Sequence, residues 1–194
     1  PDSAFPITWR LNTTKGTNVT GSRALPDVLR SAFAAWGNVP TAQISFTDGQ
    51  AAPANLIDAA FDQINLISFM PAALSSDVVS LTVVYAFADS GVDQFGRTIE
   101  FPGQILEADI LFNPAVQFST DAVTPSGKID LEGQAVHEIG HLLGLDDSGL
   151  LSSVMSRAPG PGASYPRALS ADDAIRVSNR YPTSAFSSST GSLS

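Results

Sequence analysis

The sequence predicts one domain of the α+β class, and three observations lead to this prediction. Short β-rich runs occupy most of the chain up to residue 112, one amphipathic helical segment interrupts them at residues 25–36, and two further helical segments follow residue 130. Strands gathered early and helices gathered late are typical of a mixed α+β arrangement. A chain of 194 residues, 43% hydrophobic and 15% charged, is large and apolar enough to bury one sizeable core.

Five runs are predicted to be strands because β-branched and aromatic residues recur in them and turn residues separate them. Pro6 suits the start of the first strand, and the pair Asp48-Gly49 ends the second. The predicted strands are Phe5–Leu11, Ala42–Phe46, Ile64–Phe69, Ser80–Phe87 and Ile105–Phe112.

The segment Leu25–Trp36 is the clearest helix in the first half of the chain. Pro26 suits the first helical turn, and Gly37 suits the end of the helix. The apolar residues recur at helical spacing, so they form one stripe that we expect to face the core rather than a binding partner. They are Leu25, Val28, Leu29, Ala32, Phe33 and Trp36.

A second helix is predicted from about Leu131 to Leu143, with Asp130 as its N-cap. It carries the only two histidines of the chain, His137 and His141, with Glu138 directly after the first. Residues four apart lie on one face of a helix, so both imidazoles can bind the same ion. The H-E-x-x-H pattern is that of zinc-binding helices in which the Glu is a general base. The alternative is a pair of packed or solvated histidines, but chance rarely places the only two histidines at this spacing around a Glu.

Asp147 is the predicted third ligand. Gly144 can adopt the left-handed conformation that ends a helix, after which the chain turns back and Asp147 can reach the ion. The chain has no Cys and no third His, so nothing supplies a ready fourth protein ligand. Structural zinc sites are closed by four protein ligands, whereas catalytic sites hold three and a water. The sequence therefore predicts an open Zn²⁺ site formed by His137, His141 and Asp147.

Two motifs resemble those of the metzincin metallopeptidases. Residues 137–147 (HEIGHLLGLDD) are similar to the extended zinc signature of that family, and residues 153–156 (SVMS) resemble its Met-turn. The chain is most similar to the matrixin-like branch, and the likeness runs from Phe5 to Asp173. Most metzincins have His at the last ligand position, whereas the snapalysin-like bacterial proteases resemble this chain in having Asp there.

The resemblance implies a twisted, mostly parallel sheet of about five strands, with an N-terminal helix, an active-site helix and a C-terminal helix. It also implies a zinc-dependent endopeptidase that hydrolyses extended protein substrates, with Glu138 as the general base and Met155 as a structural floor below the metal. An extended peptide would add as a strand to an edge of the sheet, which we expect to be Ser80–Phe87. Arg157 stands where many metzincins carry an auxiliary Tyr ligand.

The end of the chain carries further family features. By resemblance, residues 157–167 shape the pocket for the substrate residue that follows the cleaved bond. Ser170 is predicted to cap a last helix, with Asp173 completing a capping box. Asp172 and Asp173 resemble the paired acids that tie the Met-turn and, in some members, the mature amino terminus. The Ser/Thr-rich residues 183–194 are predicted to be a tail or linker, which leaves residues 1–182 as the catalytic domain.

A calcium site is the second metal site that we consider. The loop Asp89–Arg97 has two carboxylates four apart and two glycines, and with Glu107 or Asp109 it offers the oxygen ligands that calcium prefers. The resembled family often carries calcium in such loops. A plain solvated turn is the alternative reading. A structural zinc is not expected, because no further His remains.

Charge and composition exclude several classes of function. The net charge of −9 argues against binding to nucleic acid or anionic membranes, which requires a positive surface. No apolar run approaches the length of a membrane span, and no signal peptide is visible. The absence of Cys is common in secreted bacterial enzymes, so we expect an extracellular protein, and no feature predicts an oligomer. Asn12 and Asn18 fit the N-glycosylation pattern, for which chance matches are an equal explanation.

Two other functions remain open from the sequence. A non-catalytic metal-binding or protein-binding pseudo-protease could keep the same scaffold. In that case Asp147, in place of the usual His, would reflect the loss of catalytic activity. The intact Glu138 argues against a pseudo-protease, since a protein that only binds a metal does not need that acid. An enzyme that cleaves something other than peptides on a similar helix is the second alternative.

Overall fold

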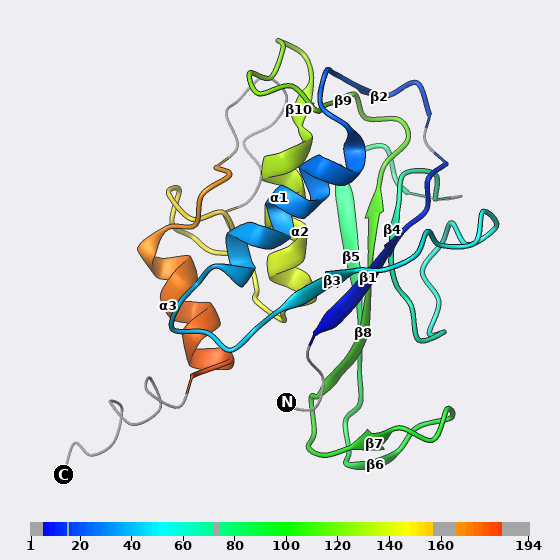
Figure 1. Cartoon of the computed structure of the whole chain (residues 1–194), viewed down its shortest axis with the longest axis vertical. Coiled ribbons are helices and arrows are strands. Elements are labelled where there is room, and N and C mark those ends of the chain that lie inside the picture. Colours follow the sequence, from blue (N-terminus) through cyan, green and yellow to red (C-terminus); the bar gives the residue numbers. More distant parts are fainter. Residues whose placement is uncertain (1–5, 15, 72–73, 157–165, 184–194) are drawn as a thin grey trace.

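A five-stranded sheet with two helices on one of its faces forms the centre of the computed structural model (Figure 1), which describes residues 6–14, 16–71, 74–156 and 166–183. The strand order is β3-β1-β4-β8-β5, and every neighbouring pair is parallel except β5 and β8. The predicted α+β class and the mostly parallel sheet are therefore confirmed. The strands are β1 (Ile7–Leu11), β3 (Phe46–Asp48), β4 (Asn65–Ser68), β5 (Ser80–Ala86) and β8 (Ile105–Phe112).

Two small sheets extend this framework. β2 (Val19–Thr20), β9 (Phe118–Ser119) and β10 (Ile129–Asp130) form a parallel sheet in the order β10-β9-β2. β6 (Gly91–Val92) and β7 (Thr98–Ile99) form a hairpin at one end of the molecule. Because β10 runs directly into the next helix, this sheet fixes where that helix begins.

The main core lies between the large sheet and two helices, α1 (Leu25–Gly37) and α2 (Leu131–Leu142). The apolar stripe predicted for α1 is buried along its whole length. Trp9 of β1 stacks on Phe33 of α1 with ring centroids 4.8 Å apart. Trp36 donates its indole N–H to the carbonyl of Val136 at 2.8 Å and so ties α1 to α2. This bond satisfies a buried polar group while holding the two helices in register.

β8 crosses the middle of the fold, and its successive side chains point to opposite faces of the sheet, as in any strand. Ala108, Ile110 and Phe112 join the core under the helices, whereas Leu111 joins a smaller core on the opposite face. Asp109 is buried and accepts hydrogen bonds from the backbone N–H groups of residues 60 and 66. Burial outweighs these bonds and raises the pKa of Asp109 to about 7.

The strand predicted at Ala42–Phe46 is wrong in position, since β3 begins where that prediction ends. Ala42 instead forms an isolated bridge with Pro182, and the N–H of Gln43 donates to the carbonyl of Tyr181 at 2.7 Å. The backbone of Ala42 and Gln43 therefore pairs with the chain beyond the last helix, and the segment joins the sheet only from Ser45, whose carbonyl accepts from the N–H of Ile7 at 2.9 Å. The other four predicted strands lie within two residues of the observed ones, apart from Phe5, which lies outside the described residues.

The last helix, α3 (Ala171–Arg180), begins as predicted. Ser170 accepts from the N–H of Asp173, and the Asp173 side chain accepts from the N–H of Ser170, which completes the capping box. In the described ranges, no helix is both long and apolar enough to cross a membrane.

The two predicted glycosylation acceptors are buried. Asn12 donates to the carbonyl of Leu56 at 2.6 Å, and Asn18 donates to that of Val116 at 3.0 Å. Both amides hold neighbouring loops in place, so chance is the better explanation of the sequence matches.

Candidate metal centre

Helix α2 places both histidines and the glutamate between them beside β5. The Asp130 side chain caps the helix by accepting from the N–H groups of Glu132 and Gly133, as the sequence predicts. Arg167 holds the Asp130 carboxylate from the other side, with its Nε 2.7 Å from Oδ2. The start of the helix is therefore fixed by a cap and an ion pair. Because His137 and His141 are four residues apart, they lie on one face of this helix, one turn from each other.

A left-handed turn brings the third predicted residue back to this helix. Gly144 has φ +77°, a conformation that glycine adopts without strain. Its N–H donates to the carbonyl of His141 at 2.8 Å, and the N–H of Leu145 donates to that of Gly140 at 3.0 Å. Beyond the turn, Asp147 Oδ1 lies 3.4 Å from His141 Nε2 and 3.6 Å from His137 Nε2. The predicted turn at Gly144 is therefore observed.

Backbone carbonyls fix the orientation of both imidazoles. The Nδ1 atom of His137 lies 2.9 Å from the carbonyl oxygen of Val154, and that of His141 lies 2.7 Å from the carbonyl oxygen of Leu145. A carbonyl can only accept a hydrogen bond, so each neutral imidazole carries its proton on Nδ1. Both Nε2 atoms therefore present lone pairs, and they lie 3.1 Å apart. Backbone carbonyls that accept from the other ring nitrogen commonly orient metal-binding histidines in this way.

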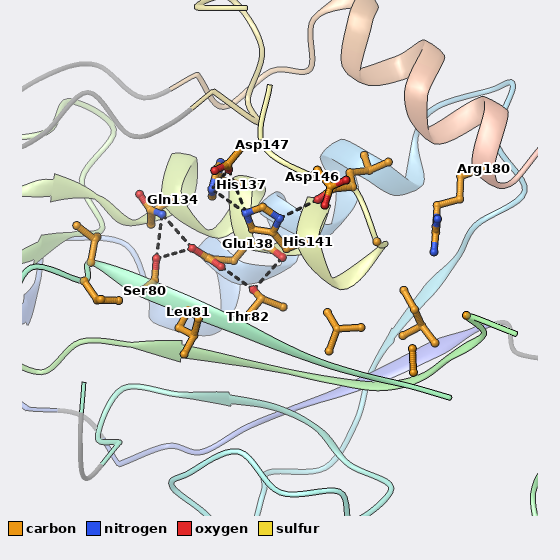
Figure 2. A pocket seen from close by; sticks show the side chains of 18 of the residues that line it. Ser80, Leu81, Thr82, Gln134, His137, Glu138, His141, Asp146, Asp147 and Arg180 are labelled. Carbon is orange, nitrogen blue, oxygen red and sulfur yellow. Dashed lines mark hydrogen bonds and ion pairs between the residues drawn. The ribbon is translucent and has the colours of Figure 1, made fainter. Parts of the chain in front are cut away.

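Three acceptor atoms thus converge on one point (Figure 2). Two Nε2 lone pairs and a carboxylate oxygen repel one another unless a proton or a cation lies between them. A tetrahedral zinc with bonds of roughly 2.0–2.1 Å separates its ligands by about 3.3–3.4 Å, close to the separations observed here. In the part of the chain that the structure describes, His137, His141 and Asp147 are the one group of three or more His, Cys, Asp or Glu residues whose ligand atoms lie within 4.8 Å of one another. The nitrogen and oxygen donors fit zinc.

Glu138 lies next to this group but its carboxylate faces β5. Ser80 donates to Oε1 at 2.6 Å, and Thr82 donates to Oε2 at 2.5 Å. Gln134, one turn earlier on α2, donates to Oε1 at 3.2 Å. Glu138 is only 3% exposed, so protein donors replace most of the water molecules that would hydrate an exposed carboxylate. No sequence pattern marks Ser80, Thr82 or Gln134 as partners of Glu138, and two of them lie more than fifty residues away on another element.

A buried methionine packs directly beneath α2. Met155 is fully buried, and its carbonyl accepts from the N–H of Ser148 at 2.7 Å. A Cβ added at Gly140 would overlap Met155 Sδ and lie 2.9 Å from the Trp36 ring. Only glycine at this position lets the turn carrying Met155 approach the helix so closely.

Replacing Gly140 with Ala is expected to lower the free energy of unfolding by about 1–3 kcal/mol, because the added methyl overpacks this contact. The shift of the turn also moves the carbonyl of Val154, which orients His137, so zinc affinity should fall as well. Urea unfolding and zinc titration measure both effects. Gly149→Ala is the matched control, since no atom of the described residues lies within 4 Å of an added Cβ there. Equal stability of the two variants would contradict the packing argument.

Asp173 ties the Met155 turn to α3, as the resemblance implies for one of the paired acids. Its carboxylate accepts from the Ser153 hydroxyl and from the N–H of Val154 at 3.0 Å, besides its bonds to Ser170. Burial acts to raise the pKa of Asp173, but these hydrogen bonds outweigh it and lower the pKa below its usual value. Asp172 is only partly buried, and the predicted tie to the amino terminus lies outside the described residues.

The lowered pKa of Asp173 predicts a dependence of stability on pH. A carboxyl whose pKa is lower in the folded state stabilises the protein above its unfolded pKa, and this contribution is lost as the pH falls through the folded pKa. The free energy of unfolding of Asp173→Asn should therefore lie about 1–3 kcal/mol below the wild type at pH 7, with the difference shrinking below about pH 4. Urea unfolding from pH 3 to 8 measures the difference. A constant difference across this range would show that Asp173 does not act through its charge.

A cavity of about 1060 Å³ runs along β5 past the converging side chains. Ser80, Thr82 and Val84 line it on one side, and Glu138, His141 and Asp147 on the other. β5 is an edge strand of the large sheet, as predicted for Ser80–Phe87, so its outer backbone edge can pair with another strand.

The structure does not bring the predicted calcium ligands together. Asp93 is paired with Arg97, whose Nε lies 2.7 Å from Oδ2, while Glu107 accepts from the N–H of Asp62 at 3.0 Å. The calcium site stays a prediction. The position of Arg157 and most of the predicted substrate-pocket loop lie outside the described residues, as does nearly all of the predicted tail.

One family of known proteins matches nearly the whole chain. The family model described as Matrixin matches residues 3–182, which include every element described above. No curated protein matches the chain.

Proposed function

Because the chain belongs to the matrixin family of zinc metallopeptidases, we propose that it is an endopeptidase in which His137, His141 and Asp147 hold the zinc and Glu138 is the general base. The observation that carries the proposal is the convergence of three acceptor atoms beside a buried carboxylate in a cleft. When bound, zinc supplies a Lewis acid that polarises the scissile carbonyl and activates a water.

The residues of the chain have separate roles in this proposal. Glu138 takes up a proton from the attacking water and passes it to the leaving amine. β5 binds the substrate as an added strand, so that the scissile bond is presented to α2 in an extended conformation. Met155 does not bind zinc, and it supports the helix from below. We also propose that Asp147 binds zinc as the third ligand in the same way as the corresponding Asp of the snapalysin-like proteases.

Hydrolysis of casein tests the proposal. The purified protein should contain about one zinc per chain and should degrade casein into internal fragments. A chelator should stop the degradation, and added zinc should restore it. A zinc-loaded protein that leaves casein and a mixed peptide library intact would favour the pseudo-protease, and the presence of an intact Glu138 at the site argues against that outcome.

We propose a secreted monomer, which fractionation of the producing cells and sedimentation would check. Calcium near residues 89–97 is proposed from the family resemblance. A rise in the unfolding temperature on adding Ca²⁺ to the chelator-treated protein would support it, and an unchanged temperature would exclude tight binding.

A further inference from the structure

We propose that Ser80, Thr82 and Gln134 form a clamp on Glu138, which holds its carboxylate in one orientation and leaves Oε2 as the oxygen that takes up the proton. This inference rests on the proposed function and adds three positioning residues and one reacting atom to it. Figure 2 shows the three side chains around the carboxylate, two from β5 and one from α2.

The direction of each hydrogen bond follows from the groups involved. An ionised carboxylate can only accept, so both hydroxyls must donate to Glu138. Ser80 also accepts from Gln134 Nε2 at 2.9 Å, which uses a lone pair and directs its single proton to Oε1 at 2.6 Å. Thr82 lies 2.5 Å from Oε2 and 3.2 Å from the Glu138 carbonyl oxygen, so the carboxylate is its closer acceptor.

The two oxygens of Glu138 are bound unequally. Oε1 receives two donors, Ser80 and Gln134, whereas Oε2 receives one, Thr82. Each carboxylate oxygen has about two lone-pair sites. Oε1 is therefore saturated by the described donors, and Oε2 keeps one site. The proton from the attacking water goes to the oxygen with the remaining site, which is Oε2.

The clamp joins the substrate-binding strand to the catalytic helix. Ser80 and Thr82 are two residues apart on β5, so both side chains point to the same face, toward α2. Gln134 and Glu138 are four residues apart on α2 and point toward β5. Charge-assisted hydrogen bonds in a buried site are short and directional, and here they fix a side chain that otherwise has three rotatable bonds. The clamp residues act through Glu138 and need not contact the substrate.

Kinetics of Thr82 variants provide the first test. Thr82→Val keeps the shape of the side chain but removes the donor to Oε2. It should lower kcat by about 10- to 100-fold with KM and bound zinc little changed, because the base is misplaced rather than lost. Thr82→Ser keeps the hydroxyl and should restore most of the rate. Thr47→Val is the matched control, an exposed Thr on the opposite edge strand, β3. Wild-type kcat in Thr82→Val with full zinc would overturn the positioning role.

A double-mutant cycle provides a second test that does not require activity. Urea unfolding is measured on the chelator-treated wild type, Thr82→Val, Glu138→Ala and the double variant. Residues in one hydrogen-bonded group give non-additive changes, so the double variant should lose less stability than the sum of the single variants. Additive changes would overturn the clamp. If the wild type hydrolyses no peptide, the proposed function fails, and this cycle still decides whether the clamp exists.

Discussion

Replacing Glu138 with Gln is expected to lower kcat by about 10²- to 10⁴-fold while zinc binding persists. The amide has nearly the shape of the carboxylate, but it cannot take up a proton at neutral pH, and general acid–base catalysis contributes rate factors of this size. Zinc binding persists because the carboxylate is not among the three converging groups. Steady-state hydrolysis of a quenched fluorescent peptide and metal analysis of the same preparation measure both quantities.

The control for this variant is Glu100→Gln, which makes the same chemical change at an exposed position away from the cleft. It should keep wild-type kcat. Turnover by the zinc-loaded Glu138 variant at a rate similar to that of the control would exclude Glu138 as the base.

Asp147→Ala should weaken zinc binding by more than about 100-fold. Loss of a residue that only orients a ligand costs about 10- to 100-fold in metal affinity, and the ligand itself contributes more than the residue that orients it. Removing the carboxylate leaves two imidazoles from one helix face, and no other described His, Cys, Asp or Glu belongs to the converging group. Competition with a fluorescent chelator measures the dissociation constant, and activity at limiting zinc should fall in parallel.

Asp146→Ala is the matched control, because Asp146 is the neighbouring exposed aspartate and its side chain is not in the converging group. Its zinc affinity should equal that of the wild type. If Asp147→Ala keeps its zinc and Asp146→Ala loses it, the third ligand has been assigned to the wrong aspartate.

The local parts of this structure could be predicted from the sequence. The spacing of His137 and His141 depends only on helical geometry, and the turn at Gly144 depends only on the freedom of glycine to adopt positive φ. The stripe of α1 and the capping box at Ser170 are also contained within one turn or one helix. Each of these features involves residues close together in the chain, so its pattern is visible without knowledge of the fold.

The parts that depend on tertiary contacts could not be predicted. The carbonyls that fix the imidazoles are backbone atoms of Leu145 and Val154, and a backbone atom has no sequence signature. The clamp on Glu138 requires β5 to lie beside α2. The strand predicted at Ala42–Phe46 starts later in the structure because the backbone of Ala42 bridges Pro182, a contact between distant parts of the chain.

The chain just beyond α3 limits how far the protein can be shortened by engineering. Tyr181 donates its hydroxyl to the carbonyl of Leu143, at the end of the histidine-bearing helix, and the adjacent backbone bonds the segment around Ala42. Truncation before Tyr181 would remove both the hydrogen bond to Leu143 and the backbone bonds to the segment around Ala42. A purification tag joined after Thr183 would leave these bonds in place. Minimal expression designs should therefore retain the chain through Thr183.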